Sequence, residues 1–429
     1  MAQPTTIRPL SIVLLALLTS QVLLVSSHKG WIGLYLSPVF FLGAGVAIGL
    51  LPLQRLPRAS RKGATPLWLW CIPLLGLLGN AWEVRDIIQQ FALDPRASDI
   101  IPSIQHMYVD RVFAGEQVYQ PYYGFGYEFH PTYLPLFWLP YLLSGGVLID
   151  HRWLAFGLLA LPLLVQHYRM TRQQGPLLEK ALKMLLPWGI TWWFIRHNPD
   201  MVGYTLEMMV AGYYVWFVLS ILAEKYWVNA GGWLLTLLSR YSNLLFVPLY
   251  AVIGWREKGW RPALYIAGIV LGGILVLYVV PFLSTNWQAF GLSYQYYSDA
   301  TLVEWQDRPD LGRPYHLYNG VGMAYWFYQL WPGELVERIT AMRYTQIALC
   351  LLATVLLGGW YLRKTRSMHW RWFLLAAFQV YMTVFYAFVQ IPYAYLYIVP
   401  VLVSMMVVLE LPWTRHSAHT EEPVLEDAV

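Results

Sequence analysis

The chain carries a series of apolar runs, each close to the length of a helix that crosses a lipid bilayer. Such a helix needs about 20 mostly apolar residues, and the windows that qualify are 10–27, 31–53, 67–82, 152–168, 181–196, 201–223, 262–283, 343–362, 372–390 and 393–411. Closed barrels are the other structure that spans lipid, but these runs are too long and too uniform for barrel strands. Hydrophobic residues make up 58% and charged residues 12%, against about 45–50% and about 25% in soluble proteins. The sequence therefore predicts an all-α polytopic membrane protein.

The distribution of basic residues predicts its orientation. Lys and Arg concentrate in four connecting segments, at 55–62, 169–183, 256–261 and 363–371. Because short cytoplasmic loops are enriched in Lys and Arg, all four segments are expected on the inner side. Both termini are then cytoplasmic, and the outer face receives 83–131, the 197–200 turn and 284–342.

Two segments depart from a simple up-and-down arrangement. A complete span at 132–149 would move the basic segment after the next helix to the outside, so we expect 132–149 to be an interfacial helix. The segment 231–255 is too short for two full spans and has Arg240 in its middle. We interpret it as two shortened helices that meet at Arg240, which becomes a candidate cavity residue because broken backbone at that depth must be buried in protein or line a wet cavity.

No separate soluble domain is indicated. Residues 1–412 are predicted to form one transmembrane domain, with 83–131 as its first outer loop and 284–342 as its second. The first apolar run, of roughly 18 residues, exceeds the usual 7–15 residues of a signal sequence, so we expect it to be a retained helix. Residues 413–429 are acidic and are predicted to be a disordered cytoplasmic tail.

The first outer loop contains a pattern typical of an amphipathic surface helix. Ile101, Ile104, Tyr108 and Val112 form an apolar stripe at helical spacing, and Asp99, Ser103, His106 and Asp110 form the opposite stripe. Gly115 is expected to end the helix. Asp99, at its start, has two interpretations that can coexist: an N-cap whose carboxylate accepts backbone N–H bonds, or a general base toward a hydroxyl acceptor. His106 and Asp110 are either a solvated helix face or part of a site.

The order of motifs after Asp99 resembles the GT-C superfamily of polyprenyl-phosphate-sugar-dependent glycosyltransferases, in particular glycosyltransferase family 87, the α-mannosyltransferase type. That family carries an Asp, then roughly 14–16 residues, then Gly-x-x-x-Tyr, then Tyr-x-Pro-Pro in its first outer loop. The match here is Asp99, Gly115, Tyr119 and Pro131. The resemblance is clearest over roughly 67–260. Thr132 replaces the second proline, and the C-terminal part has PYAYLYIVP where related enzymes often carry a Trp-His-His-like motif.

The resemblance implies a fold and an activity. The fold would be a GT-C-like bundle of about 10–13 transmembrane helices with amphipathic juxtamembrane helices in the first long outer loop. The activity would be inverting transfer of a sugar, such as mannose, from a polyprenyl-phosphate donor to a lipid or glycan acceptor on the outer face. Asp99 would be the base. The expected location is the inner (plasma) membrane of a bacterium. The scheme requires no metal and no cofactor, although carboxylates in the outer loop could hold a hard divalent ion, and nothing indicates nucleic-acid binding.

Positive charge is needed where the lipid phosphate leaves. Arg240 matches the Lys or Arg between two short helices in related enzymes, and its alternative role is to reach lipid headgroups. Glu207, an intramembrane carboxylate, is expected to pair with Arg240 or with Arg196. The further candidates for phosphate binding are Arg196, Arg313 and His316, and those for substrate binding are His106, Asp110, Tyr119, Glu128, His130, Glu207, Tyr241, Asn319 and Tyr393.

Two functions of other classes remain open from the sequence. One is a transporter or flippase for a lipid-linked substrate, which would need ionisable groups strung through the bilayer between related halves. The other is a non-catalytic subunit of an envelope-glycan assembly. Most charge in this chain gathers in segments expected at one face, which favours transfer.

Overall fold

The computed structural model describes residues 6–27, 32–54, 66–147, 149–173, 175–364 and 369–415. The fold is all-α apart from a pair of two-residue strands, β1 (Thr6–Ile7) and β2 (Thr414–Arg415). The first half contains α1 (Pro9–Ser26), α2 (Gly33–Leu50), η1 (Leu51–Gln54), η2 (Leu67–Trp70), α3 (Cys71–Gln90), α4 (Ile100–Ser103), η3 (Ile104–Val109), α5 (Asp110–Ala114), α6 (Pro135–Trp138), α7 (Tyr141–Gly146), α8 (His151–Thr171), α9 (Leu177–His197), α10 (Asp200–Gly203) and α11 (Glu207–Leu222). The second half contains α12 (Tyr226–Leu237), η4 (Tyr241–Phe246), α13 (Val247–Lys258), α14 (Trp260–Ile274), η5 (Leu275–Leu283), α15 (Gln288–Trp305), α16 (Tyr315–Asn319), α17 (Ala324–Leu330), α18 (Leu335–Lys364), α19 (Trp370–Ala387), η7 (Ala394–Tyr397) and α20 (Ile398–Glu410).

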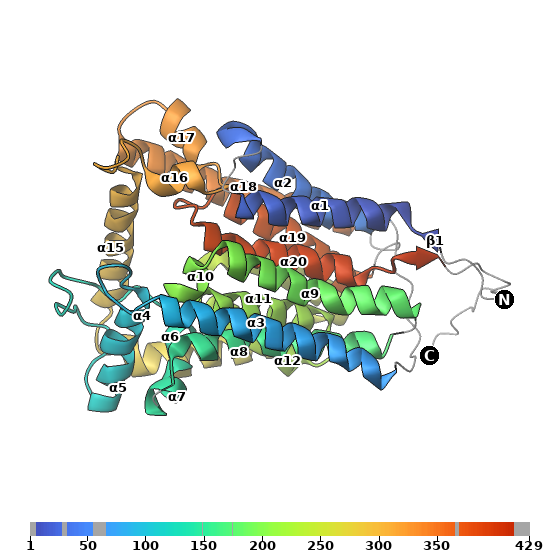
Figure 1. Cartoon of the computed structure of the whole chain (residues 1–429), viewed down its shortest axis with the longest axis horizontal. Helices are drawn as coiled ribbons and strands as arrows, with labels where there is room; N and C mark the ends of the chain where they lie inside the picture. Colours follow the sequence, from blue (N-terminus) through green and yellow to red (C-terminus); the bar gives the residue numbers. More distant parts are fainter. Residues whose placement is uncertain are drawn as a thin grey trace.

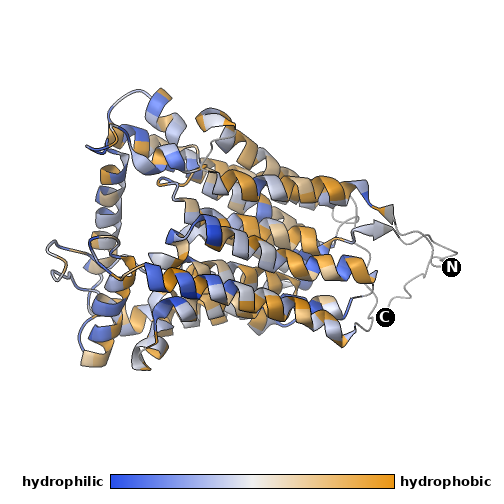
Figure 2. Ribbon diagram, viewed as in Figure 1, coloured by the Kyte–Doolittle hydropathy of each residue, from blue (hydrophilic) through white to orange (hydrophobic). Residues whose placement is uncertain are grey.

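The long helices form a bundle, and the short polar elements gather at one end of it. In Figure 1, α4 to α7 and α15 to α17 lie at the left end, and β1 lies at the opposite end. Figure 2 shows that the bundle is mainly hydrophobic, whereas hydrophilic residues are frequent in the segments at the left end. The centre consists of α11, α19 and α20, in which nearly every residue is buried. By contrast, α14 buries none of its residues and lies at the periphery.

The prediction of a membrane protein is confirmed. Within the described residues, five helices are long and apolar enough to cross a membrane, or six if α6–α7 and α8 together form one broken span. The described part of every window predicted from the sequence is helical over most of its length. Among the other expected spans, α11 is short, with 16 residues, whereas α8 and α9 have 21 residues each. The expected number of 10–13 transmembrane helices stays a prediction.

The two N-terminal helices are integral to the bundle. Gln21, on α1, accepts a hydrogen bond of 2.9 Å from Ser404 of α20, and Gln379 of α19 donates to the Ser404 hydroxyl at 2.5 Å. All three side chains are fully buried. Helix α2 packs closely on α19 because Gly45 faces Thr383, and a Cβ at residue 45 would collide with that side chain. Buried polar groups need partners, so this network fixes α1 and α2 against the C-terminal helices.

The described ends of the chain meet at the end of the bundle away from the short polar elements. β1 pairs antiparallel with β2, so Thr6 lies opposite Arg415. The buried carboxylate of Glu179 accepts bonds from the backbone N–H groups of Trp413 and Thr414, at 2.9 and 3.1 Å. Residues 413–415 are therefore ordered, and the expected tail boundary at 413 is wrong. Residues 416–429 lie outside the described part.

The basic connections are also found near this end. Lys258, at the end of α13, lies 5.4 Å from the ring centre of Trp370, the first residue of α19. Arg169, near the end of α8, is 3.5 Å from Glu410 at the end of α20. This segregation of basic connections from the short polar elements agrees with the predicted arrangement of loops, whereas the compartment that each end faces stays a prediction. Residues 55–62 lie outside the described part.

The expected single helix at 132–149 is divided. It consists of α6 and α7, and the pair is bent by 119° from α8. The prolines explain why the segment is divided into two short helices. Pro135 begins α6, and Pro140 precedes the first residue of α7. A proline lacks the N–H that a helix interior requires and disfavours helical geometry in the residue before it. The expected position of segment 132–149 at the membrane interface stays a prediction.

Candidate functional site

Asp99 stands at the head of a short helix that covers the polar end of the bundle. The helix is continuous from α4 through η3 to α5 and ends at Gly115, whose φ of 70° is left-handed. Ile101, Ile104 and Tyr108 are buried as predicted, and His106 and Asp110 are exposed. Ser103 is buried instead of exposed, and its hydroxyl donates to the carbonyl of Ile100 at 2.8 Å. Ser103 is buried together with its neighbours Ile101 and Pro102 in α4.

The carboxylate of Asp99 does not cap the helix. An N-cap residue normally has extended backbone, which brings its side chain to the N–H groups of the first turn. Asp99 has φ −91° and ψ −6°, which is helical, and its side chain makes no capping bond. The capping interpretation is therefore wrong. Instead, the Tyr127 hydroxyl donates to Oδ2 of Asp99 at 2.7 Å, and the Asp99 side chain is half-buried at the surface.

A small hairpin brings Tyr127 to Asp99. The backbone of Tyr122 and that of Phe129 exchange two hydrogen bonds of 2.9 Å each, and Gly126, with φ 83°, permits the turn between them. Arg111 fixes the segment just before the hairpin, because its guanidinium donates to the carbonyls of Gln120 and Pro121 at 2.6 and 2.8 Å. Burial first, and then the bond to Asp99, raise the pKa of Tyr127 above its usual range, so this hydroxyl stays a donor.

The other candidates in the first loop make pairs of their own. His106 contacts Asp110 at 2.9 Å on the exposed face. Glu128 accepts a bond of 2.9 Å from the Tyr123 hydroxyl and lies 3.3 Å from His130.

Tyr119 is placed in the packing beneath this loop. It is only 5% exposed. Its hydroxyl donates to the carbonyl of Tyr133 at 2.7 Å and accepts from Trp138 at 3.2 Å. These two bonds join the segment after Gly115 to α6. The residue supports the loop through these bonds, and its role in substrate binding stays a prediction.

Arg240 lies in the predicted break between two short helices. Its backbone is extended, with φ −158° and ψ 142°, between α12 and η4. The guanidinium donates to both carboxylate oxygens of Glu207 at 2.7 Å and to the Tyr386 hydroxyl at 3.2 Å. Glu207 is 2% exposed and Arg240 24%. The expected pairing of these two residues is confirmed. The neighbouring Tyr241 is exposed, and its ring lies 6.4 Å from that of Phe290.

Four tyrosines lie within electrostatic range of Asp99 or of Arg240, and we call them the tyrosine layer: Tyr133, Tyr296, Tyr297 and Tyr395. Burial first and the Asp99 charge second raise the pKa of Tyr296 to about 12. Tyr133 lies within electrostatic range of both Asp99 and Tyr395. Tyr395 in turn lies within range of Glu207 and Arg240. Tyr133 and Tyr395 thus connect the surroundings of Asp99 with those of Glu207 and Arg240 through charge interactions.

A second cluster of polar side chains surrounds Glu304 of α15. Glu304 itself was not predicted from the sequence as a site residue. Tyr393 donates to Oε1 of Glu304 at 3.2 Å, and Nε2 of His316 lies 3.7 Å from Oε2. Burial raises the pKa of Glu304. Burial first and the Arg308 charge second lower the pKa of His316 to about 4, so this ring is neutral near pH 7. Tyr395 lies within electrostatic range of Glu304, which joins the cluster to the tyrosine layer.

The remaining predicted phosphate ligands, Arg196 and Arg313, contact other groups than Glu207. Arg196 is 59% exposed and contacts Glu83 at 3.3 Å, so it is not the partner of Glu207. Arg313 lies 5.1 Å from the ring centre of Tyr318. Asn319 is half-buried at the end of α16.

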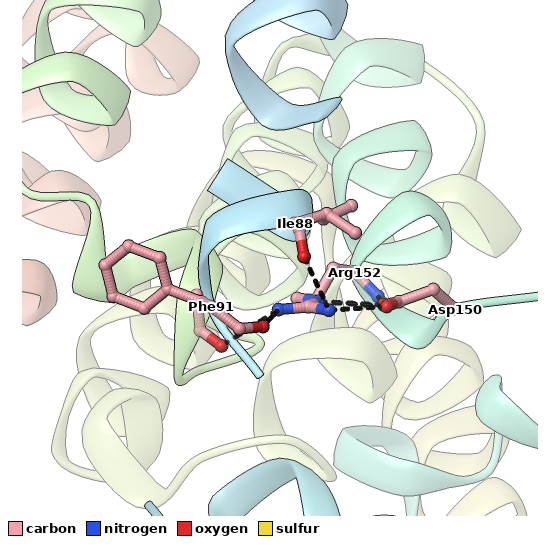
Figure 3. Close-up of polar contacts among 5 residues, drawn as sticks. Ile88, Phe91, Asp150 and Arg152 are labelled. Carbon is pink, nitrogen blue, oxygen red and sulfur yellow. Dashed lines mark hydrogen bonds and ion pairs between the residues drawn. The ribbon is translucent and has the colours of Figure 1, made fainter. Parts of the chain in front are cut away.

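Sequence reasoning missed the buried Arg152, which anchors the start of the first outer loop. Figure 3 shows its guanidinium between Asp150 and the carbonyls at the end of α3. It donates to the carbonyl of Phe91 at 2.9 Å and to Asp150 at 2.6 Å. The Asp150 carboxylate also caps α8 by accepting from the Arg152 N–H. In the sequence, an Asp two residues before an Arg at the start of a helix could have indicated this pair. The carbonyl partners of Arg152 are distant along the chain and could not be predicted from the sequence.

Two observations bear on ligands. In the described part of the chain, no three His, Cys, Asp or Glu side chains come together in a way that could hold a metal ion. A shallow groove of about 690 Å³ lies between the end of α17 and the start of α18, lined by Trp331, Val336, Thr340 and Tyr344 among others. None of the predicted site residues lines it.

Comparison with known proteins gives no relative. No family model matches the chain, and neither a curated protein nor a solved structure matches it.

Proposed function

We propose that this membrane protein transfers a sugar from a polyprenyl-phosphate donor to a hydroxyl of a lipid or glycan acceptor, at the end of the bundle that carries Asp99. The observation that supports this most directly is the state of Asp99. Its carboxylate is half-buried at the head of a surface helix and is not used as a helix cap. A carboxylate that keeps acceptor capacity at a membrane surface is suited to remove a proton from a hydroxyl.

The chemistry assigns each bond to a group. Asp99 takes the proton of the acceptor hydroxyl, and the acceptor oxygen attacks the anomeric carbon of the sugar from the face opposite the lipid phosphate. The bond between that carbon and the phosphate oxygen breaks, and polyprenyl phosphate leaves with the electron pair. The configuration at the anomeric carbon is inverted. Tyr127, which donates to Oδ2 of Asp99 at 2.7 Å, orients the carboxylate.

The surroundings of Asp99 support transfer over other chemistry at this site. Tyrosine rings and polar side chains are the groups that pack on sugars and bond to their hydroxyls, and the tyrosine layer includes residues near Asp99 and residues near the half-buried Arg240. The polar segments gather at one end of an apolar bundle (Figure 2). That is where a donor with a lipid tail and a polar head would meet an acceptor. The proposed location is the outer face of a bacterial inner membrane, with both termini cytoplasmic.

The test is sugar transfer by purified protein from synthetic polyprenyl-phosphate sugars, with mannose first. Asp99→Asn keeps the size and can still accept the Tyr127 bond, but it removes the base. We expect kcat to fall by about 100-fold or more, since general-base catalysis contributes about 10²- to 10⁴-fold. The matched control is Asp94→Asn. Asp94 is an exposed loop residue that accepts a 2.9 Å bond from the Arg96 N–H, which asparagine can also accept.

The outcomes separate the alternatives. A folded Asp99→Asn protein with wild-type transfer would show that Asp99 is not the base. Wild-type protein that moves the lipid-linked sugar between leaflets of a vesicle without transferring it would be a flippase. Wild-type protein that does neither with any donor tested would contradict the proposal.

A further inference from the structure

Two arginines lie near Tyr297 of α15, and in the described part of the chain only Arg240 has a carboxylate partner. The charges of Arg240 and Arg343 both act on Tyr297 of α15. Tyr297 is 43% exposed. Arg240 stands at the break before η4 and Arg343 belongs to α18, so charges from two separate elements act on this tyrosine.

Arg343 bonds only to neutral groups in the part of the chain that the structure describes. Its guanidinium contacts the Tyr294 hydroxyl, and Nη2 donates to Ser298 at 3.3 Å and to Oε1 of Gln390 at 3.2 Å. The Tyr294 ring centre lies 5.2 Å from Cζ of Arg343. By contrast, the carboxylate of Glu207 neutralises Arg240 through two bonds of 2.7 Å.

Such a cation is suited to receive an external anion. A half-buried guanidinium without a counter-ion bears a desolvation cost that an incoming anion offsets. Its planar, multiple N–H donors match phosphate oxygens. Arg343 is eight residues from the start of α18, which at about 1.5 Å per residue places it roughly 12 Å along the helix. Since α18 is also a candidate span, a phosphate at this depth would be one attached to a lipid.

We propose that Arg343 is the residue that binds the phosphate of the lipid carrier, whereas Arg240 is held by Glu207 and positions the adjoining tyrosine layer. This rests on the proposed function and refines it, because it moves the phosphate from Arg240, the residue expected from the sequence, to a residue of α18. Tyr294 and Ser298 would orient the guanidinium from α15. The sugar on the phosphate would then lie along the layer that leads to Asp99.

The test measures binding of a long-chain polyprenyl monophosphate to the purified full-length protein in detergent by native mass spectrometry. Polyprenol without phosphate and phosphatidylglycerol are the comparison ligands, and they distinguish carrier phosphate from a general lipid headgroup. Arg343→Gln is expected to weaken polyprenyl-phosphate binding about tenfold or more, because hydrogen bonds to charged groups are among the strong ones. Arg343→Lys should bind more tightly than Arg343→Gln. Arg338→Gln is the matched control on the same helix, since Arg338 donates to the carbonyls of Gly333 and Tyr328.

A second variant keeps the packing and changes only the charge. Gln390→Glu is nearly the same size and would place a carboxylate beside Arg343, where Oε1 now lies 3.2 Å away. If Arg343 binds phosphate, this internal anion competes and binding should fall about tenfold. If Arg343 only clamps α15 to α18, Gln390→Glu should leave binding unchanged.

The two proposals can fail separately. Wild-type affinity in both Arg343→Gln and Gln390→Glu overturns the role of Arg343, and the transfer assay then still decides the function. Equal loss of phosphatidylglycerol and polyprenyl-phosphate binding would also overturn it, because the site would be a general headgroup site. Arg343-dependent binding in a protein that transfers no sugar would support the site and contradict the function.

Discussion

Removing the carboxylate of the buried Glu207–Arg240 pair should destabilise the protein strongly. Glu207→Gln keeps the shape of the side chain but leaves Arg240 without a counter-ion. Two charge-assisted bonds of 2.7 Å are affected, and Glu207 is 2% exposed. Breaking a buried pair costs about 3–5 kcal/mol, since one charge is left uncompensated. Because Arg240 is 24% exposed and can recruit water, we expect the lower end of that range, about 3 kcal/mol.

The assay is unfolding in mixed micelles with a rising fraction of denaturing detergent, followed by tryptophan fluorescence. Glu224→Gln is the control, because the Glu224 side chain is 88% exposed and lies 3.9 Å from Arg371. An exposed pair of this kind is worth about 0–1 kcal/mol.

The double variant Glu207→Gln, Arg240→Gln removes both charges. It should be closer to wild type than Glu207→Gln alone, because the uncompensated charge is gone. The reasoning would be refuted if Glu207→Gln were as stable as Glu224→Gln, or if the effects of the two substitutions simply added.

Two further predictions follow from the buried polar groups. Gln21→Leu should lower the free energy of unfolding by about 1–3 kcal/mol, because the Ser404 hydroxyl loses the acceptor that lies 2.9 Å away; the same unfolding assay measures it, and an unchanged midpoint would show that α1 is not held by this network. His316 should contribute to a loss of stability in acid. Its pKa is lowered from 6.5 to about 4 in the folded state, so as pH falls below 6.5 the unfolded chain binds the proton first and is stabilised. The cost of keeping His316 neutral is absent above pH 6.5 and grows between 6.5 and about 4. His316→Asn, which does not titrate, should show a smaller decline of the unfolding midpoint over that window, and equal slopes in the two proteins would contradict the lowered pKa.

The sequence predicted several features of the candidate site because they depend on local physics. A short apolar segment interrupted by Arg240 indicated a break, and the backbone there is extended between α12 and η4. The spacing of Ile101, Ile104 and Tyr108 indicated the buried face of the surface helix, and Gly115 indicated its end. These are consequences of helical period and of the conformations that glycine permits.

Other features could not be predicted because their partners are distant along the chain. The carboxylate of Asp99 was expected to cap its helix, but a hydroxyl 28 residues away binds it instead. The neutral partners of Arg343 come from α15 and from the segment before η7. Arg152 is held at carbonyls of α3 and α10. No local pattern contains this information, since each contact forms only when separate helices pack.

By itself, the sequence determined that this chain is helical, lies in a membrane, and breaks at Arg240, because hydrophobic length and periodicity act within one segment. Only the tertiary structure decided which charges are neutralised. It paired Arg240 with Glu207, left Arg343 among neutral groups, and placed the tyrosine layer between Asp99 and the arginines. The physical reason is that the energy of a charge depends on its burial and on its nearest partners in space, and packing of distant helices sets both.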